Sequence, residues 1–323
     1  LYGLFHDNPL HEAMQVAYFP ESPRPKWLSP VVGLGNFDGL HRGHQQLVDE
    51  VRRRARERGG TSAVMIFDPH PPRVIRPDKA PPLLMTLDQK LAAFQRAGLE
   101  AVAVVRFTHE LSRWEPELFV ETVIVDWLRA AEVWVGANFL FGRDRSGTFT
   151  LLRALGEDRG FRVEKIEPVR YKDFVVSSTR VRHLVQEGRV DEAGSLLGHH
   201  YTIEGTVEHG DGRGRGLGFP TANLQTANEL LPANGIYASI AIVDGACHRA
   251  VTSVGVRPTI GDGRSTVEAH LLDGEHALYG KTLRLAFVKW LRGQIRFDGL
   301  EALREQMGRD VAEASALFDH MDV

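Results

Sequence analysis

The sequence has a single cysteine, no long apolar run and no excess of positive charge, and each absence excludes a class of protein. One cysteine, Cys247, cannot form an intrachain disulfide and is typical of a reducing compartment. We expect it to be a small buried side chain in a strand. No apolar run approaches the roughly 18 residues that cross a bilayer, so no membrane association is expected. The net charge of −3 argues against a broadly basic nucleic-acid surface.

The remaining composition is that of an ordinary globular protein. Hydrophobic residues make up 43% and charged residues 25% of the chain, and 323 residues suffice for two domains. The first residues lack a cationic segment and contain His6, Asp7 and Glu12, so they do not resemble a secretory signal. We therefore expect a cytoplasmic protein of two domains.

The first half of the chain alternates β-rich runs with helix-periodic stretches. The expected strands cover 31–37, 62–67, 101–107, 132–135 and 161–169, and the expected helices cover 45–58, 87–97 and 116–130. Leu47, Val48, Val51 and Ala55 would share one face of the first helix. Such alternation predicts a parallel sheet with helices on both faces, which binds ligands beyond the carboxyl ends of its strands.

The pattern changes near Gly198. Helices are expected over 178–186 and 190–197, followed by closely spaced strands at 201–208, 236–243, 248–254, 265–272 and 282–290. Asp244-Gly245 is a strong signal for a tight hairpin, and 300–318 reads as a final helix. We predict an α/β domain over 1–198 and, over 199–323, a small antiparallel β-barrel or sandwich with a C-terminal helix.

A first chemical signature follows the first expected strand, at the start of a helix. Its candidate site residues are Gly35, Phe37, Asp38, Gly39, His41 and His44. The two histidines are three apart, so both rings could face one way. The glycines let phosphate approach the backbone, and the helix N-terminus favours an anion. The imidazoles would stabilise charge on an attacked α-phosphate, although histidines here could also merely cap the helix.

A second device, Ser178, Thr179 and Arg182, starts a later helix. Hydroxyls there cap the helix and can bind phosphate, while arginine offers a planar cationic fork. Without the histidine pair, this segment would be no more than a good N-cap.

These two elements resemble the HxGH and ISSTxxR motifs of the nucleotidyltransferase superfamily. Segments 67–71 and 136–142 resemble loops of prokaryotic FMN adenylyltransferases, so the resemblance implies a Rossmann-like nucleotidyltransferase domain. It also implies that His41 and His44 contact ATP phosphates, that Asn138 lines the flavin or nucleotide pocket, and that the Ser178 segment closes on the triphosphate. Asp68 would belong to this site, although an aspartate before proline often caps a turn or helix.

The second signature, 209–223, joins a glycine-rich loop to a Pro-Thr-Ala-Asn run. Glycines permit a flap whose N–H groups wrap phosphate, and Thr221 and Asn223 offer oxygens suited to Mg²⁺. The segment is not a P-loop, because Gly-Lys-Ser/Thr is absent. A solvated Arg-Gly loop or a simple hairpin connection are the alternatives.

Phosphoryl transfer to an alcohol also needs a base. Glu268 alternates with Val267 and Ala269 on an expected strand, so its side chain faces away from theirs. An ordinary surface carboxylate on a strand would show the same alternation. Segment 201–311 resembles riboflavin kinase. The resemblance implies that Glu268 is the catalytic base and that Thr221 and Asn223 hold Mg-nucleotide. Further nucleotide- or flavin-binding residues would be Gly210, Arg215, Gly218, Phe219 and Pro220.

Nearly the whole chain thus resembles the bifunctional riboflavin kinase/FMN adenylyltransferases. The barrel would transfer the γ-phosphate of ATP to riboflavin, giving FMN and ADP. The α/β domain would then join FMN to AMP from a second ATP, giving FAD and pyrophosphate. The resemblance implies Mg²⁺, ATP and flavins as the only ligands, with no nucleic acid and no membrane.

Three alternatives remain open from the sequence. The chain could be a nucleotidyltransferase for another acceptor, similar to cytidylyltransferases, although such an enzyme has no need of the barrel. It could be a flavin-binding regulator with inactive sites, against which the intact His41, His44 and Glu268 argue. It could bind RNA through Arg213 and Arg215, with affinity that falls steeply with salt.

Overall fold

The computed structural model describes residues 13–209, 216–256, 265–274 and 276–321. Contacts divide the chain into two compact units: residues up to Pro82 with Leu87–Ser177, and Leu83–Thr86 with the chain from Ser178 onward. Helices α6 (Ser178–Gln186) and α7 (Val190–Leu197) thus group with the second unit. The boundary at 198 stays a prediction.

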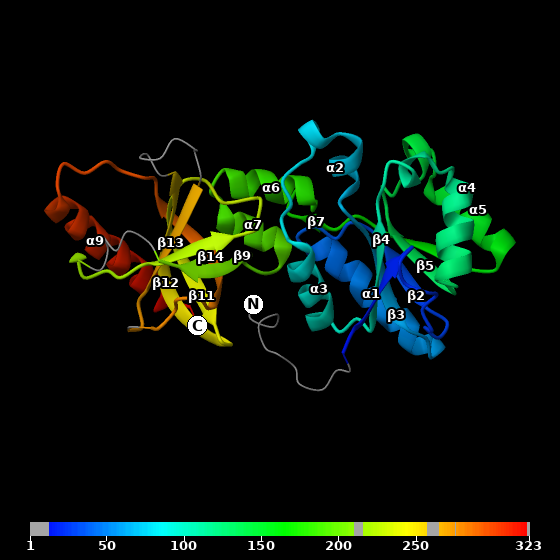
Figure 1. Cartoon of the computed structure of the whole chain (residues 1–323), viewed down its shortest axis with the longest axis horizontal. Coiled ribbons are helices and arrows are strands. Elements are labelled where there is room, and N and C mark those ends of the chain that lie inside the picture. Colours follow the sequence, from blue (N-terminus) through cyan, green and yellow to red (C-terminus); the bar gives the residue numbers. More distant parts are fainter. Residues whose placement is uncertain (1–12, 210–215, 257–264, 275, 322–323) are drawn as a thin grey trace. The chain divides into compact units, whose positions relative to one another are not determined.

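The first unit contains a six-stranded sheet in the order β1-β4-β3-β2-β5-β6 (Figure 1). Its strands are β1 (Gln15–Phe19), β2 (Val31–Leu34), β3 (Ser62–Asp68), β4 (Ala101–Arg106), β5 (Glu132–Gly136) and β6 (Arg162–Ile166). Every neighbouring pair is parallel, which confirms the predicted α/β class. The central strands are almost continuously apolar because both of their faces are covered.

Helix α1 (Arg42–Arg58) covers one face of this sheet. Leu47, Val48, Val51 and Ala55 are its buried residues, as predicted. Gly33 in β2 permits the close approach, since a Cβ there would lie 2.4 Å from Leu47 Cδ2. The helix ends at Gly59, whose φ of 61° places it in the left-handed region. The sequence pattern and the packing therefore agree over this helix.

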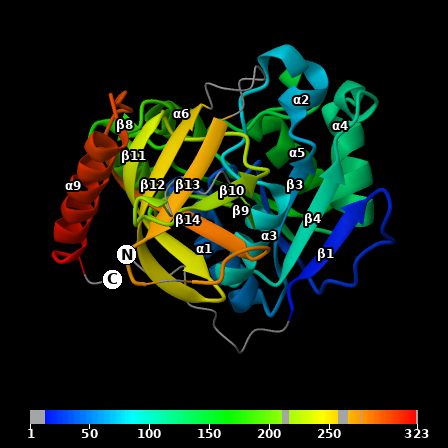
Figure 2. The ribbon, with the colours of Figure 1, turned by 60° about the vertical axis from the view of Figure 1, so that its left-hand side comes forward.

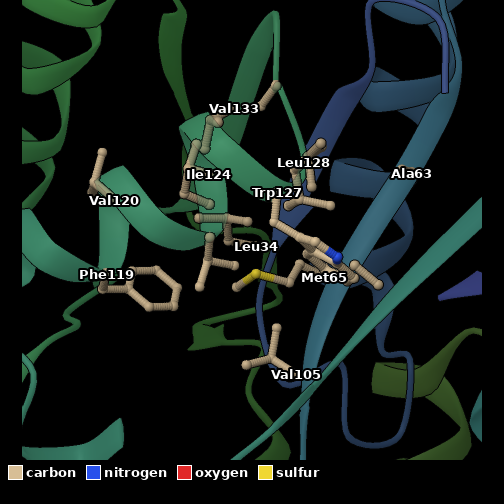
Figure 3. Packing of buried hydrophobic residues seen from close by; sticks show 14 of the residues in the cluster. Leu34, Ala63, Met65, Val105, Phe119, Val120, Ile124, Trp127, Leu128 and Val133 are labelled. Atoms are coloured by element: carbon tan, nitrogen blue, oxygen red, sulfur yellow. The ribbon is translucent and has the colours of Figure 1, made fainter. Parts of the chain in front are cut away.

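The opposite face carries an apolar core cluster (Figure 3). Leu34, Met65 and Val105 of the sheet lie in one cluster with Phe119 and Ile124 from the covering helices. These helices are α4 (Pro116–Phe119), the π-helix η3 (Val120–Trp127) and α5 (Phe149–Arg159). The sequence predicted one helix over 116–130, and the structure instead changes to π-helical hydrogen bonds after the first turn.

Shorter elements complete this unit. They are α2 (Pro71–Ile75), η1 (Pro77–Lys79), α3 (Leu87–Arg96), η2 (Leu111–Arg113), η4 (Arg143–Arg145), and the paired β7 (Arg170–Tyr171) and β8 (Phe174–Val175).

The second unit contains a closed antiparallel barrel in the order β10-β13-β12-β11-β14-β9. The strands are β9 (Tyr201–Glu208), β10 (Ala222–Thr226), β11 (Gly235–Val243), β12 (Ala246–Val256), β13 (Ser265–Leu271) and β14 (Thr282–Arg292). Pairing of β10 with β9 closes the ring, and Asp244-Gly245 makes the predicted hairpin with positive φ at both residues. The barrel prediction is confirmed.

Helix α9 (Leu300–Phe318) packs beside the barrel strands (Figure 2). A buried ion pair holds it there: the Arg292 guanidinium donates to both carboxylate oxygens of Asp310, at 2.7 and 2.6 Å. None of the helices in the described part of the chain is long and apolar enough to cross a membrane.

The prediction that Cys247 is buried is wrong. Cys247 is exposed because it lies in β12 just after the hairpin turn, paired with Ile242 near the end of the strand.

A buried carboxylate at the amino end of β5 gives a stability prediction. Glu132 is fully buried and accepts from Arg54 Nε and Nη2, both at 2.9 Å, and from Trp134 Nε1 at 2.8 Å. Burial tends to raise the pKa of Glu132, but the Arg54 and Trp134 hydrogen bonds outweigh burial and lower it.

Arg54→Ala should lower the free energy of unfolding by about 2–3 kcal/mol. This loss is somewhat smaller than for a buried charge that loses its only partner, because Trp134 and Arg58 remain beside Glu132. Urea denaturation of the whole chain measures the loss, and it should be largest above pH 5, where Glu132 is ionised. Arg53→Ala, an exposed arginine on the same helix, is the matched control and should change little. An equal loss in both variants would contradict the account.

Candidate active sites

The first signature forms a tight loop between β2 and α1. Phe37, Gly39 and Leu40 have φ of 49°, 84° and 40°, so the backbone enters the left-handed region at each. That conformation costs a non-glycine residue about 1 kcal/mol and is concentrated at functional sites. Phe37, Asp38 and Leu40 are nonetheless buried to 1% exposure or less. Packing of these side chains therefore holds the strained loop in place.

The loop delivers two stacked imidazoles. The rings of His41 and His44 lie 3.6 Å apart at an interplanar angle of 14°, so they do face one way. His41 is the N-cap of α1, and its Nδ1 accepts from the His44 backbone N–H at 3.3 Å. The capping alternative is thus also true of His41. Because Nδ1 accepts, the ring proton lies on Nε2, where it can serve as a donor.

His44 has a different environment. Its Nδ1 is buried and has no hydrogen-bond partner within the described part of the chain. Such a nitrogen costs about 1–3 kcal/mol and is the kind of group that a ligand or water satisfies. Burial, then the positive charges of His41 and Lys90, lower the pKa of His44 well below its usual 6.5. His44 is therefore neutral at pH 7.

This pKa shift has a measurable consequence for stability. The unfolded chain binds a proton at His44 near pH 6.5 and the folded chain does not, so the unfolding free energy should fall by about 1 kcal/mol from pH 7.5 to 5.5. The dependence should flatten once pH drops below the folded pKa. Urea titrations at each pH test this: His44→Ala should remove that part of the slope, whereas the exposed His109→Ala should keep it. A slope unchanged in His44→Ala would refute the shift.

The order of the strands places two more residues, Asp68 and Asn138, at the edge of the sheet that carries the histidine loop. From β2 the chain adds β3 and β4 on one side of β2, and later adds β5 and β6 on its other side. The direction of strand addition therefore reverses between β2 and β5, and sheets of this kind bind ligands at such a switch point. Asp68 ends β3, and Asn138 lies in the turn after β5. Both strands pair with β2, so Asp68, Asn138 and the histidine loop share one sheet edge. Asp68 is half-buried and Asn138 exposed.

The capping alternative for Asp68 has no support in the described contacts. Helix α2 begins after His70, and no side chain caps it. Ser178, Thr179 and Arg182 lie on α6 in the second unit, with Arg182 buried. Their assignment to the histidine site stays a prediction.

The barrel brings together the polar residues of the second signature. Asn223 in β10 is the register partner of Glu268 in β13, and Thr221 Oγ1 donates to Glu268 Oε2 at 3.4 Å. Val267, Ala269 and Leu271 are buried while Glu268 is half-buried, as alternation predicted. A hydroxyl, an amide and a carboxylate thus meet on the outward side of two paired strands.

His270 lies beside this cluster, and no role was expected for it from the sequence. Its Nδ1 lies 2.8 Å from the Pro220 carbonyl and must donate to it, because a carbonyl only accepts. Its ring also meets Phe219 edge-on at 5.4 Å. These contacts fix the backbone leading to Thr221. Its position two residues after Glu268, on the same face of the strand, is the sequence feature that could have identified it.

Gly210 and Arg215 lie outside the described residues. Gly218, with φ of 86°, lies three residues before Thr221 in the described part of this segment. Among the residues described, no three His, Cys, Asp or Glu side chains form a group that could hold a metal. Thr221, Asn223 and Glu268 each carry a side-chain oxygen that could contact a cation.

The fold and sites define a class: a parallel α/β unit with stacked histidines at its switch point, on one chain with a closed barrel carrying a Thr–Asn–Glu cluster. Two family models match it, FAD synthetase at residues 24–180 and riboflavin kinase at residues 197–318. The chain belongs to the bifunctional riboflavin kinase/FMN adenylyltransferase family.

Individual relatives cover nearly the whole chain. A bifunctional riboflavin kinase/FMN adenylyltransferase from Pseudomonas fluorescens is 39% identical over 94% of this chain and 98% of its own length. Its counterpart from Escherichia coli K12 is 36% identical over 89% and 92%, and that from Bacillus subtilis 34% over 90% and 93%. A crystal structure named as a macrolide-efflux protein from Streptococcus pneumoniae has a TM-score of 0.84 at 27% identity, covering 94% of this chain and 99% of that one. It is similar to this chain in fold.

Proposed function

We propose that this chain makes FAD from riboflavin in two ATP-dependent steps, one in each unit. Membership of the family supports both activities, and both family models match in the corresponding halves. The observation that supports it most is the presence of two chemically different clusters in separate units, stacked imidazoles in one and Thr–Asn–Glu in the other.

In the barrel, Glu268 is the base for phosphorylation of riboflavin. It takes the proton of the 5′-hydroxyl while that oxygen bonds to the γ-phosphorus of ATP. The bond from the γ-phosphorus to the β,γ-bridging oxygen breaks, giving FMN and ADP. The 3.4 Å contact from Thr221 supports this role, because it orients the carboxylate. His270 holds Pro220 and thereby positions the Thr221 segment.

Mg²⁺ fits the donor set of this site. Thr221, Asn223 and Glu268 offer neutral and anionic oxygens, which Mg²⁺ prefers, and too few to replace the waters and phosphate oxygens that it usually keeps. Thr221 and Asn223 would hold it with ATP, where it would offset the phosphate charge. Gly210, Arg215, Gly218 and Phe219 would bind the nucleotide or flavin around it.

In the first unit, the FMN phosphate attacks the α-phosphorus of a second ATP. An FMN oxygen bonds to that phosphorus, and the bond to the α,β-bridging oxygen breaks, releasing pyrophosphate. His41 donates from Nε2, and the neutral His44 beside it binds the same phosphate group. Gly35, Phe37, Asp38 and Gly39 shape the loop, and Asp68 and Asn138 line the sheet edge.

Incubation of the full chain with riboflavin, ATP and Mg²⁺ tests this function, with flavins resolved by chromatography. FMN should appear first and FAD after a lag, and omission of Mg²⁺ should stop both. No flavin product, or AMP transfer to another acceptor in preference to FMN, would contradict the proposal.

A further inference from the structure

Helix α3 carries a lysine on the face that packs toward the histidine loop. The buried residues of α3 are Lys90, Ala93 and Phe94. The Phe94 ring meets the Phe37 ring edge-on at 5.4 Å, and the Phe37 ring lies 5.1 Å from that of His44. Lys90 precedes Phe94 by four residues, which is one helical turn, so the two side chains share a face.

Lys90 is only 5% exposed. Lysine is almost never buried unless its charge is used, because removing an ammonium group from water is costly. Its charge acts at the histidine site, since it contributes to the lowered pKa of His44 after burial and His41. The shared helix face and the ring contacts from Phe94 through Phe37 to His44 place this charge on the side of α3 that packs toward the imidazole.

The groups around the histidine loop indicate what the charge of Lys90 could do. An ATP triphosphate is strongly anionic, yet His44 is neutral at pH 7. Asp38, the acidic residue of the loop, is itself buried at 1% exposure. The His44 ring therefore has hydrogen-bonding atoms without a charge, and α3 supplies an ammonium group on the face that packs toward it.

We propose that Lys90 is a phosphate-binding residue of the adenylyl-transfer site, where its ammonium group holds the ATP polyphosphate beside His41 and His44. From the sequence, the helix over 87–97 was expected only to cover the sheet, and no role was expected for Lys90. The inference rests on the proposed adenylyl transfer in the first unit.

Lys90→Met tests this proposal, because methionine keeps the length of the side chain and removes its charge. In the conversion of FMN to FAD by the full chain, the KM for ATP should rise roughly 10- to 100-fold, the range for losing a contact to a charged group. The KM for FMN and the kinase rate should stay near wild type. Lys90→Arg should recover most of the ATP affinity, and the exposed Lys79→Met is the matched control.

A second readout separates charge from structure. An NMR titration of the His44 ring should show a higher pKa in Lys90→Met than in wild type, still below 6.5 because burial and His41 remain, and an unchanged pKa in Lys90→Arg and Lys79→Met. If Lys90→Met loses its thermal transition, Lys90→Gln takes its place with the same expectations. A wild-type KM for ATP in a folded neutral variant would overturn the proposal. Absence of FAD formation by the wild-type chain would instead refute the proposed function itself.

Discussion

Glu268→Gln should stop FMN formation from riboflavin while supplied FMN is still converted to FAD. Glutamine keeps the shape of the side chain and can still receive the 3.4 Å contact from Thr221, but it cannot take the hydroxyl proton. Loss of a general base typically costs 10²- to 10⁴-fold, so the initial rate of FMN formation should fall by about that factor. Chromatography of flavins from parallel reactions, one started with riboflavin and one with FMN, measures both rates.

Glu305→Gln is the matched control for this substitution. It makes the same chemical change at an exposed position on α9, and both rates should stay at wild type. A Glu268→Gln protein that is folded and still phosphorylates riboflavin at the wild-type rate would remove Glu268 from the mechanism. The half-buried carboxylate would then be the surface residue that its strand alternation also allows.

His44→Ala should have the opposite effect, with FMN accumulating and FAD formation falling by about 10²- to 10³-fold. The substitution removes one imidazole of the stacked pair and so a donor to the attacked phosphate. The Thr221–Glu268 cluster lies in the other unit, so phosphorylation of riboflavin should be unaffected. The same two-substrate assay measures this result.

His109→Ala, an exposed histidine in the same unit, controls for loss of an imidazole in general. If His44→Ala and Glu268→Gln each stopped both reactions equally in folded protein, the two sites would not be independent. That outcome would contradict the division of labour between the units.

Strongly periodic elements could be predicted from the sequence almost to the residue. The buried face of α1, the Asp244-Gly245 hairpin and the bounds of α9 all agree with the structure. The edge strand β1 could not be found, because only one of its five residues is buried and its alternation is weak. Helix α5 buries only Leu152 and Gly156, so its apolar face is narrow. The π-helical turns of η3 leave no mark in a 3.6-residue pattern.

The sites divide in a similar way. The histidine loop was predictable because its residues are contiguous, and the outward direction of Glu268 followed from strand alternation. The approach of Thr221 to Glu268 was not, since it depends on β10 pairing with β13 rather than on either segment. Lys90 was overlooked because a lysine on a helix is ordinarily a solvated residue, although its spacing from Ala93 and Phe94 marks the buried face.

In the proposed function, the two units cleave ATP at different phosphates, one after the other. The most direct measurement uses ATP labelled with different phosphorus isotopes at the α and γ positions, with riboflavin as the only flavin supplied. FMN should contain only the γ label, and the FAD that follows should contain both labels in equal amount. FAD that lacks the γ label, or FMN that contains the α label, would contradict it.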